Sequence, residues 1–150
     1  MADILLKRVM SKDLNEVLDM ERSVNSKTYA GRVSEKEVAD FINNEVVYFI
    51  EISNATIGMV SYKIEAPGHV RVDGLIVKPE FRNKGLAKEA MKMVLEELKD
   101  KKRIDLTVHP HNNPAILLYL SLGFIIESWK DNYYSEGEPR LILVYQNKLQ

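Results

Sequence analysis

The chain has 150 residues, 45% of them hydrophobic, which suits one domain with a single core, expected to span residues 1–150. Its 21 basic and 22 acidic residues give a net charge of -1, which offers no field for nonspecific nucleic-acid binding. The absence of cysteine excludes disulfides and an acyl-cysteine intermediate. Because no signal peptide or long apolar run is recognisable, we expect a cytoplasmic protein with neither nucleic acid nor membrane as a partner.

The first part of the chain shows a strand pattern, two helix patterns and then a hairpin pattern. The second helix begins at the capping box Ser34-x-x-Glu37, in which a hydroxyl and a carboxylate satisfy free backbone N–H groups. The expected elements cover residues 4–9, 11 to about 23, 34 onward, and 46–52 with 56–64.

The most informative segment leads from a strand through a short basic turn into a long helix. Residues 70–77 have the composition of a strand, and an apolar stripe at helical spacing begins at Ala87. Between them lies the pattern Arg82-x-x-Gly85-x-Ala87, in which glycine lets the backbone approach a phosphate and free helix N–H groups face the anion. The cations around this point are Arg82, Lys84 and Lys88. The segment therefore predicts a pyrophosphate site, with an ordinary strand-to-helix turn as the alternative.

A second strand follows the long helix, since residues 104–108 alternate between apolar and polar side chains. A strand, a crossover helix and a returning strand lie parallel with a right-handed connection. The basic turn is therefore expected at the carboxyl end of the first strand, where open α/β sheets bind ligands.

A second motif occupies residues 111–124. An asparagine at position 112 or 113 can cap a helix, and Gly123 suits the exit from it. Tyr119 falls on the apolar face of this helix, where a core tyrosine with a bonded hydroxyl is the simplest interpretation. Two further strands, at about residues 125–129 and 141–149, flank a polar turn.

Together, Arg82-x-x-Gly85-x-Ala87 and Asn112-x-x-Ala115-Ile116-x-Leu118-Tyr119-x-x-x-Gly123-Phe124 resemble the motifs of the GCN5-related N-acetyltransferases, the GNAT superfamily. The resemblance is strong over about residues 70–130. It implies a mixed α/β fold, with a central, mostly antiparallel sheet of six to seven strands, one parallel pair at the cofactor site and about four flanking helices. It also implies an acetyl-CoA-dependent N-acyltransferase, without a metal, that moves the acetyl group directly to a primary amine through a tetrahedral intermediate.

The resemblance assigns roles to individual residues. In such enzymes the pantetheine arm of acetyl-CoA pairs with the strand corresponding to Leu75, Ile76 and Val77. Asn112 contacts the cofactor and Tyr119 protonates the departing thiolate, a role that suits a phenol that is protonated at neutral pH. The residues placed against the pyrophosphate are Arg82, Asn83, Lys84, Gly85, Leu86, Ala87 and Lys88.

The general base is less well defined by the sequence. Ribosomal-protein-type N-terminal acetyltransferases, which the chain also resembles, often carry a glutamate at the position of Thr107, and a threonine cannot act as that base. Asp73, one strand away, is our candidate for the base. Glu21 and His109 are substitutes, and a solvated or structural role for each side chain, with a water relay to the amine, stays open.

Residues 131–138 resemble the Tyr-Tyr and Gly-Glu hairpin of protein N-terminal acetyltransferases. The resemblance places Tyr133 and Tyr134 in one wall of a peptide slot, and residues between Glu21 and Tyr29 in the other. A polar hairpin turn without this role is the alternative.

The chain also departs from that subfamily. It carries Pro139-Arg140 where Asp-Ala is usual, and its first-helix loop lacks the usual proline-tryptophan pair. Acetylation of a small amine, such as a polyamine, amino acid or aminoglycoside, therefore stays open beside a peptide N-terminus. So do a non-catalytic acyl-CoA sensor and a generic nucleotide-binding domain, although no Gly-x-Gly-x-x-Gly pattern is present. The sequence does not decide between a monomer and a homodimer, or between acetyl and longer acyl donors.

Overall fold

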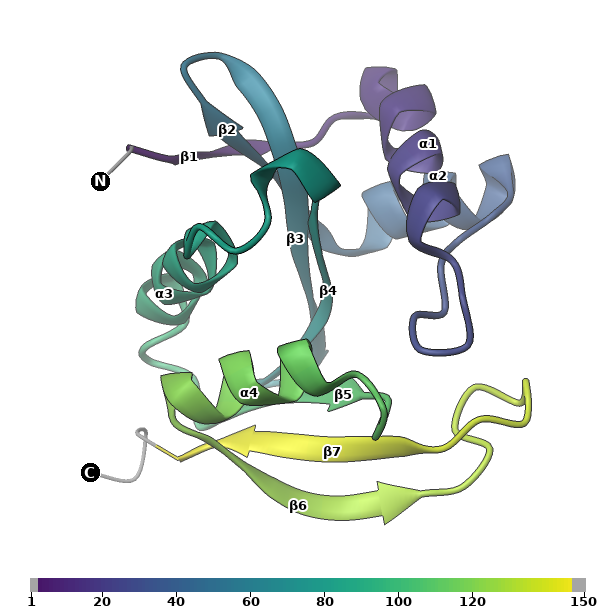
Figure 1. The fold of residues 1–150 in the computed structure, drawn as a ribbon, viewed down its shortest axis with the longest axis vertical. Helices are drawn as coiled ribbons and strands as arrows, with labels where there is room; N and C mark the ends of the chain where they lie inside the picture. The colour runs from purple at the N-terminus through teal and green to yellow at the C-terminus, as the bar shows by residue number, and fades with distance from the viewer. Residues whose placement is uncertain (1–2, 147–150) are drawn as a thin grey trace.

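The computed structural model describes residues 3–146, and these residues form a seven-stranded sheet with helices on both faces (Figure 1). The strand order is β1-β2-β3-β4-β5-β7-β6, and every neighbouring pair is antiparallel except β4 with β5. This confirms the expected mixed α/β fold. In chain order the elements are β1 (Leu5–Arg8), η1 (Ser11–Asp13), α1 (Leu14–Val24), α2 (Glu35–Asn44), β2 (Val46–Ile52), β3 (Ala55–Ala66), β4 (His69–Val77), η2 (Pro79–Phe81), α3 (Leu86–Glu97), β5 (Arg103–Val108), α4 (Asn113–Leu122), β6 (Phe124–Lys130) and β7 (Arg140–Tyr145).

Two hydrophobic clusters hold the helices to the sheet. Val17 of α1 and Val38 of α2 are buried in one cluster with Phe49 of β2, whereas Met91 of α3 and Ile50 of β2 belong to the other. Successive residues of β2 thus enter different clusters, as the twofold alternation of a strand requires. The sheet consequently separates α1 and α2 from α3 and α4 (Figure 1).

The helix ends follow the sequence signals with small differences. Ser34 caps α2 by accepting a hydrogen bond from the Glu37 backbone N–H at 3.1 Å. The first helix begins later than predicted, because Ser11–Asp13 form a separate 3-10 turn before α1. Of the strand expected at residues 141–149, β7 accounts for residues 141–145, and residues 147–150 lie outside the described range.

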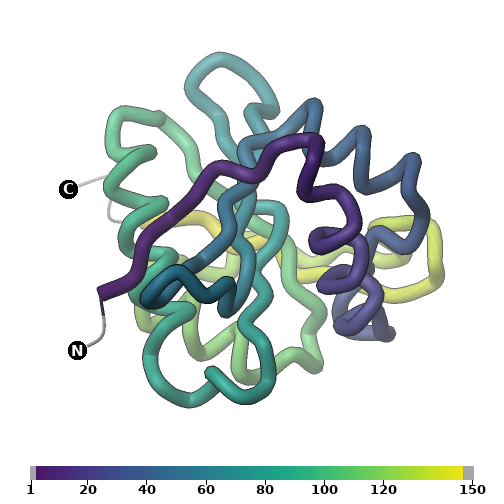
Figure 2. Tube along the Cα trace, turned by 90° about the horizontal axis from the view of Figure 1, so that it is seen from above, coloured from purple at the N-terminus to yellow at the C-terminus, as the bar shows by residue number. Residues whose placement is uncertain are grey.

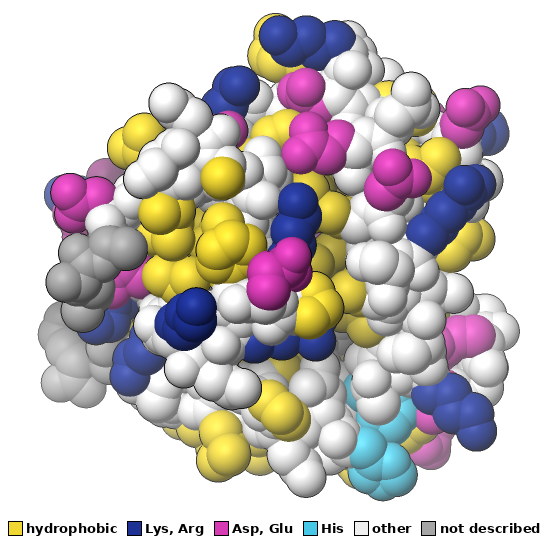
Figure 3. Space-filling view, turned by 45° about the horizontal axis from the view of Figure 1, so that its top comes forward, with side chains coloured by type: hydrophobic (Ala, Val, Ile, Leu, Met, Phe, Trp, Pro, Cys, Tyr) yellow, Lys and Arg dark blue, Asp and Glu magenta, His cyan; other side chains and the backbone are white. Residues whose placement is uncertain are grey.

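The surface has mixed charge. On the face drawn in Figure 3, basic and acidic side chains are interspersed, in keeping with the net charge of -1. Within residues 3–146 no helix is long and apolar enough to cross a membrane.

Candidate active site

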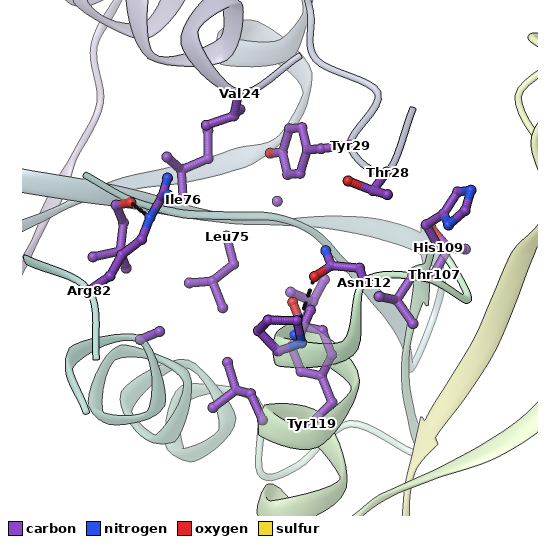
Figure 4. A pocket seen from close by; sticks show the side chains of 18 of the residues that line it. Val24, Thr28, Tyr29, Leu75, Ile76, Arg82, Thr107, His109, Asn112 and Tyr119 are labelled. Carbon is purple, nitrogen blue, oxygen red and sulfur yellow. Dashed lines mark hydrogen bonds between the residues drawn. The ribbon is translucent and has the colours of Figure 1, made fainter. Parts of the chain in front are cut away.

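A cavity of about 650 Å³ lies where β4 and β5 diverge, bordered by the start of α3 and by α4 (Figure 4). The parallel pairing of these strands ends at Val72 and Leu106, so the rest of β4 turns an open edge toward the cavity. Most of the predicted site residues come together here. Those that line it are Tyr29, Asp73, Leu75, Ile76, Val77, Arg82, Asn83, Gly85, Leu86, Ala87, Lys88, Asn112, Tyr119 and Tyr134.

The basic turn after β4 has the features of an anion cradle. Gly85 caps α3 with a φ of 77°, a left-handed conformation that favours glycine, and a Cβ placed there would meet no atom within 4 Å. The first helical bond of α3 joins the Glu89 N–H to the Gly85 carbonyl at 3.1 Å, so the three preceding amides have no intrahelical acceptor. Arg82 steadies the turn by donating from Nε to the Val77 carbonyl at 2.8 Å. The site therefore fits a pyrophosphate, as the sequence predicts, although Lys84 does not line the cavity.

Tyr119 extends from α4 into the cavity and is 7% exposed (Figure 4). Its ring packs edge-on against Phe124 with centroids 5.7 Å apart. Burial raises the pKa of its hydroxyl, which therefore stays protonated. Within the described chain this hydroxyl makes no hydrogen bond, whereas the simplest interpretation of the sequence is a core tyrosine with a bonded hydroxyl. Asn112 beside it caps α4 by accepting from the Ala115 N–H at 3.4 Å.

A second hollow, of about 680 Å³, lies beyond the first. The two share Ser26, Ala30, Asp73 and Tyr134 in their linings, so Asp73 lies where they meet. The loop after α1 forms one wall of the second hollow, and the loop between β6 and β7, which extends toward it, forms the other (Figures 1 and 2). An acceptor can therefore approach the cavity from this side.

A charged network fixes the inner wall. The Arg32 guanidinium contacts the Glu21 carboxylate at 2.8 Å and the Asp73 carboxylate at 2.5 Å, and the Tyr29 hydroxyl donates to Glu21 at 3.2 Å. Glu21 is 0% exposed, which corrects its predicted place in the substrate wall: its oxygens are used to hold Tyr29 and Arg32. Neither Arg32 nor Glu45, which also faces Arg32 at 3.6 Å, was identified from the sequence, because neither belongs to a motif.

Tyr133 and Tyr134, although adjacent in sequence, have different surroundings. Tyr134 lines both hollows, and its hydroxyl lies 2.8 Å from the Thr107 hydroxyl. Tyr133 lines neither hollow, contrary to its predicted place in the peptide slot, because its hydroxyl accepts a hydrogen bond from Arg71 at 2.6 Å. Arg140, where the sequence departs from its subfamily, is buried in the cavity wall with its guanidinium 5.1 Å from the Tyr134 ring.

His109 is a poor base in this arrangement. It is 2% exposed, and its Nδ1 accepts a hydrogen bond from the His111 N–H at 3.0 Å. Its Nε2 must then carry the proton and donate to Glu138 at 2.7 Å. Both ring nitrogens are therefore engaged, which leaves Asp73 as the carboxylate that faces both hollows.

Known proteins resemble this chain in sequence and fold. Residues 13–124 match the acetyltransferase (GNAT) family. The catalytic subunit NAA20 of the N-terminal acetyltransferase B complex of Arabidopsis thaliana is 38% identical over 95 residues, which are 59% of this chain and 54% of the relative. A putative ribosomal protein bS18 alanine N-acetyltransferase of Bacillus subtilis is 32% identical over 76 residues, 49% of this chain and 50% of that protein. The chain thus spans about half the length of these curated relatives.

A solved structure with a similar fold is a spermidine N-acetyltransferase SpeG chimera from Vibrio cholerae and hSSAT. It superposes with a TM-score of 0.81 at 18% identity and covers 98% of both chains.

Proposed function

The chain belongs to the acetyltransferase (GNAT) family, and we propose that it transfers an acetyl group from acetyl-CoA to a primary amine, with the α-amine of a protein or peptide N-terminus as the acceptor. One observation carries this proposal. The open edge of β4, the anion cradle before α3 and the unbonded hydroxyl of Tyr119 border a single cavity, with Asp73 at its other end. These are the parts that acyl transfer between a thioester and an amine requires.

Each part has a role in holding the two substrates. Acetyl-CoA supplies the acetyl thioester. The free amides of residues 86–88, with Arg82 and Lys88 nearby, would bind its pyrophosphate, and the unpaired edge of β4 from Asp73 to Val77 would bind its pantetheine amides. Bound in this way, acetyl-CoA would present its thioester sulfur to α4.

Two side chains would move protons. The buried Tyr119 hydroxyl is protonated and has no competing partner within residues 3–146, so it can donate to the sulfur as the carbon–sulfur bond breaks. Asp73 would accept the proton that the amine loses as its nitrogen bonds to the acetyl carbon. An α-amine, with an ordinary pKa near 8, is a more accessible nucleophile than a lysine side chain near 10.4.

Two observations favour an N-terminus over a small amine. Both curated relatives are named for acetylation of protein N-termini or of a ribosomal protein's alanine. The second hollow, walled by Tyr134 and the loop after α1, gives room for the residues that follow the reacting amine.

Mass spectrometry of a mixed panel incubated with acetyl-CoA tests the proposal. The panel contains peptides with free N-termini, α-blocked lysine peptides and small amines such as spermidine, with an enzyme-free control. We expect acetate on α-amines. Acetate confined to a small amine would overturn the assigned acceptor, and no transfer to any member would favour an acyl-CoA-binding module.

A further inference from the structure

Three carboxylates surround one guanidinium at the inner end of the acceptor route. Glu21, Glu45 and Asp73 all lie within 4 Å of Arg32, and their side chains are 0%, 10% and 21% exposed. Three ionised carboxylates around a single cation leave uncompensated negative charge in a poorly solvated place. Such a group lowers its energy by keeping one proton.

Glu45 is the carboxyl group whose surroundings favour that proton. One nitrogen of Arg32, Nη2, contacts Asp73 Oδ2 at 2.5 Å and Glu45 Oε2 at 3.6 Å, which brings the two carboxyl groups together. Glu45 Oε1 is buried and has no hydrogen-bond partner among the described residues. A proton on Glu45 can be donated to the neighbouring carboxylate of Asp73. In agreement, burial and then the neighbouring Asp73 carboxyl group raise the pKa of Glu45 to about 8.

We propose that Asp73 and Glu45 share one proton and act as a unit, an inference that rests on the proposed function. In this unit Asp73 takes the proton of the acceptor amine, and Glu45 sets the proton affinity of Asp73. Glu45 lines neither hollow, so it is a positioning residue that acts through Asp73. When both carboxyl groups are ionised, their repulsion makes the pair a much stronger base than a lone carboxylate bound to arginine. A base of this strength matches an α-amine.

The proton can be followed through one turnover. The amine N–H bond breaks as nitrogen bonds to the acetyl carbon, and the proton passes to the pair at Asp73. Tyr119 donates its proton to the sulfur that leaves. Asp73, which is partly exposed in the second hollow, then returns its proton to solvent, and Tyr119 takes up a proton from solvent once the thiol has left.

Several other charged or titratable groups face the pair. Tyr29 and Tyr134 have pKa values raised above the ordinary value of a phenol, in both cases mainly by burial. The groups concerned are Arg32, Lys63, Glu21, Tyr29, Tyr134 and Arg8, whose guanidinium donates to the Glu45 carbonyl.

The pH dependence of kcat at saturating acetyl-CoA and peptide tests the inference in the wild type, Glu45→Gln and Glu51→Gln. Glu51 is a half-buried β2 glutamate that is paired with Lys7 and lines neither hollow, and it serves as the matched control. We expect kcat to rise with pH, with a midpoint near pH 8, in the wild type and the control. Glu45→Gln should lower this midpoint by at least about one pH unit and should lower kcat at high pH by about 10-fold. An unchanged midpoint in Glu45→Gln, with acetyl-CoA binding intact, would overturn it.

A carboxyl ¹³C NMR titration of the wild type separates this inference from the proposed function and does not depend on the folding of a variant. Asp73→Asn identifies the resonances of the pair. A shared proton predicts that both carboxyl signals shift together near pH 8 without any substrate. If they do so while no amine is acetylated, the proposed function fails and the paired proton holds. If the two signals titrate independently below about pH 5, the inference is overturned whatever the activity.

Discussion

Val72 and Leu106 form the last pair of the parallel ladder between β4 and β5, although β4 continues to Val77. Beyond this pair the two strands separate, and β4 keeps only its antiparallel partner β3. The backbone edge that is left open faces the cavity between α3 and α4 (Figure 4). The break in pairing thus creates both the space and the hydrogen-bonding edge that we assign to acetyl-CoA.

Tyr119→Phe is expected to lower kcat by at least about 10-fold, because it removes the proton donor to the leaving sulfur. Acetyl-CoA binding and the melting temperature should change little, since the hydroxyl makes no hydrogen bond within the described chain. Release of the CoA thiol measures kcat, and thermal-shift titration with acetyl-CoA measures binding and the melting temperature. Tyr48→Phe, which removes a hydroxyl bonded to Glu97 outside the cavity, is the control and should keep the wild-type kcat. Equal turnover in Tyr119→Phe and wild type would return Tyr119 to a packing role.

Gly85→Ala is expected to weaken acetyl-CoA binding by about 10-fold or more, because a methyl group there projects into the open cradle. The left-handed φ of 77° also predicts a stability loss of about 1 kcal/mol. Gly68→Ala shares the strain, with a φ of 78° in the turn between β3 and β4, but lies outside the cavity. Calorimetric titration should therefore show weaker binding only in Gly85→Ala. If both variants bind acetyl-CoA equally well, the cradle assignment is wrong.

Arg32→Gln is expected to lower the free energy of unfolding by about 3–5 kcal/mol, because it leaves buried carboxylates without their cation. Lys36→Gln removes a cation from an exposed ion pair with Asp40, in which the lysine side chain is 85% exposed, and should leave the stability almost unchanged. Urea unfolding of the two variants provides the comparison. If Arg32→Gln loses no more stability than Lys36→Gln, the stabilising role of the charged network around Arg32 is contradicted.

Stability should fall as pH rises from about 5 to 8. The pKa of Glu45 is about 8 in the folded protein and near 4.5 in the unfolded chain, so the folded state binds more protons in this window. Each pH unit then lowers the free energy of unfolding by up to about 1.4 kcal/mol. Urea titrations at pH 6 and pH 8 should show this loss in the wild type and in Glu51→Gln, and a smaller one in Glu45→Gln. Equal slopes in all three proteins would argue against a protonated Glu45.

Much of the fold was predictable because its signals are local. The glycines at 85 and 123 both adopt left-handed conformations at helix ends, and the parallel pair follows from the strand, helix and strand order. The start of α1 was predicted too early, because Ser11 begins a 3-10 turn whose side chains give the same signal as a helix start.

The grouping of the residues that we assign to the cofactor was also predictable, whereas the grouping on the proposed acceptor side was not. Arg82 belongs to a spaced motif in the turn before α3 and Tyr119 to one on α4, and the fold brings them to one cavity. Arg32 and Asp73 meet across 41 residues, and no local pattern records such a pairing. Similarly, nothing in the Tyr-Tyr dipeptide shows that Tyr133 turns to Arg71 while Tyr134 faces the hollows, because that difference depends on tertiary contacts.

The most direct test of the account is a crystal structure with a bisubstrate analogue that joins a peptide α-nitrogen to CoA. We predict the pantetheine along the β4 edge at residues 73–77, the pyrophosphate on the amides of residues 86–88, the sulfur beside the Tyr119 hydroxyl and the peptide in the second hollow past Asp73. Binding of the analogue away from the gap between β4 and β5, or with its α-nitrogen out of reach of both Tyr119 and Asp73, would contradict the proposed active site.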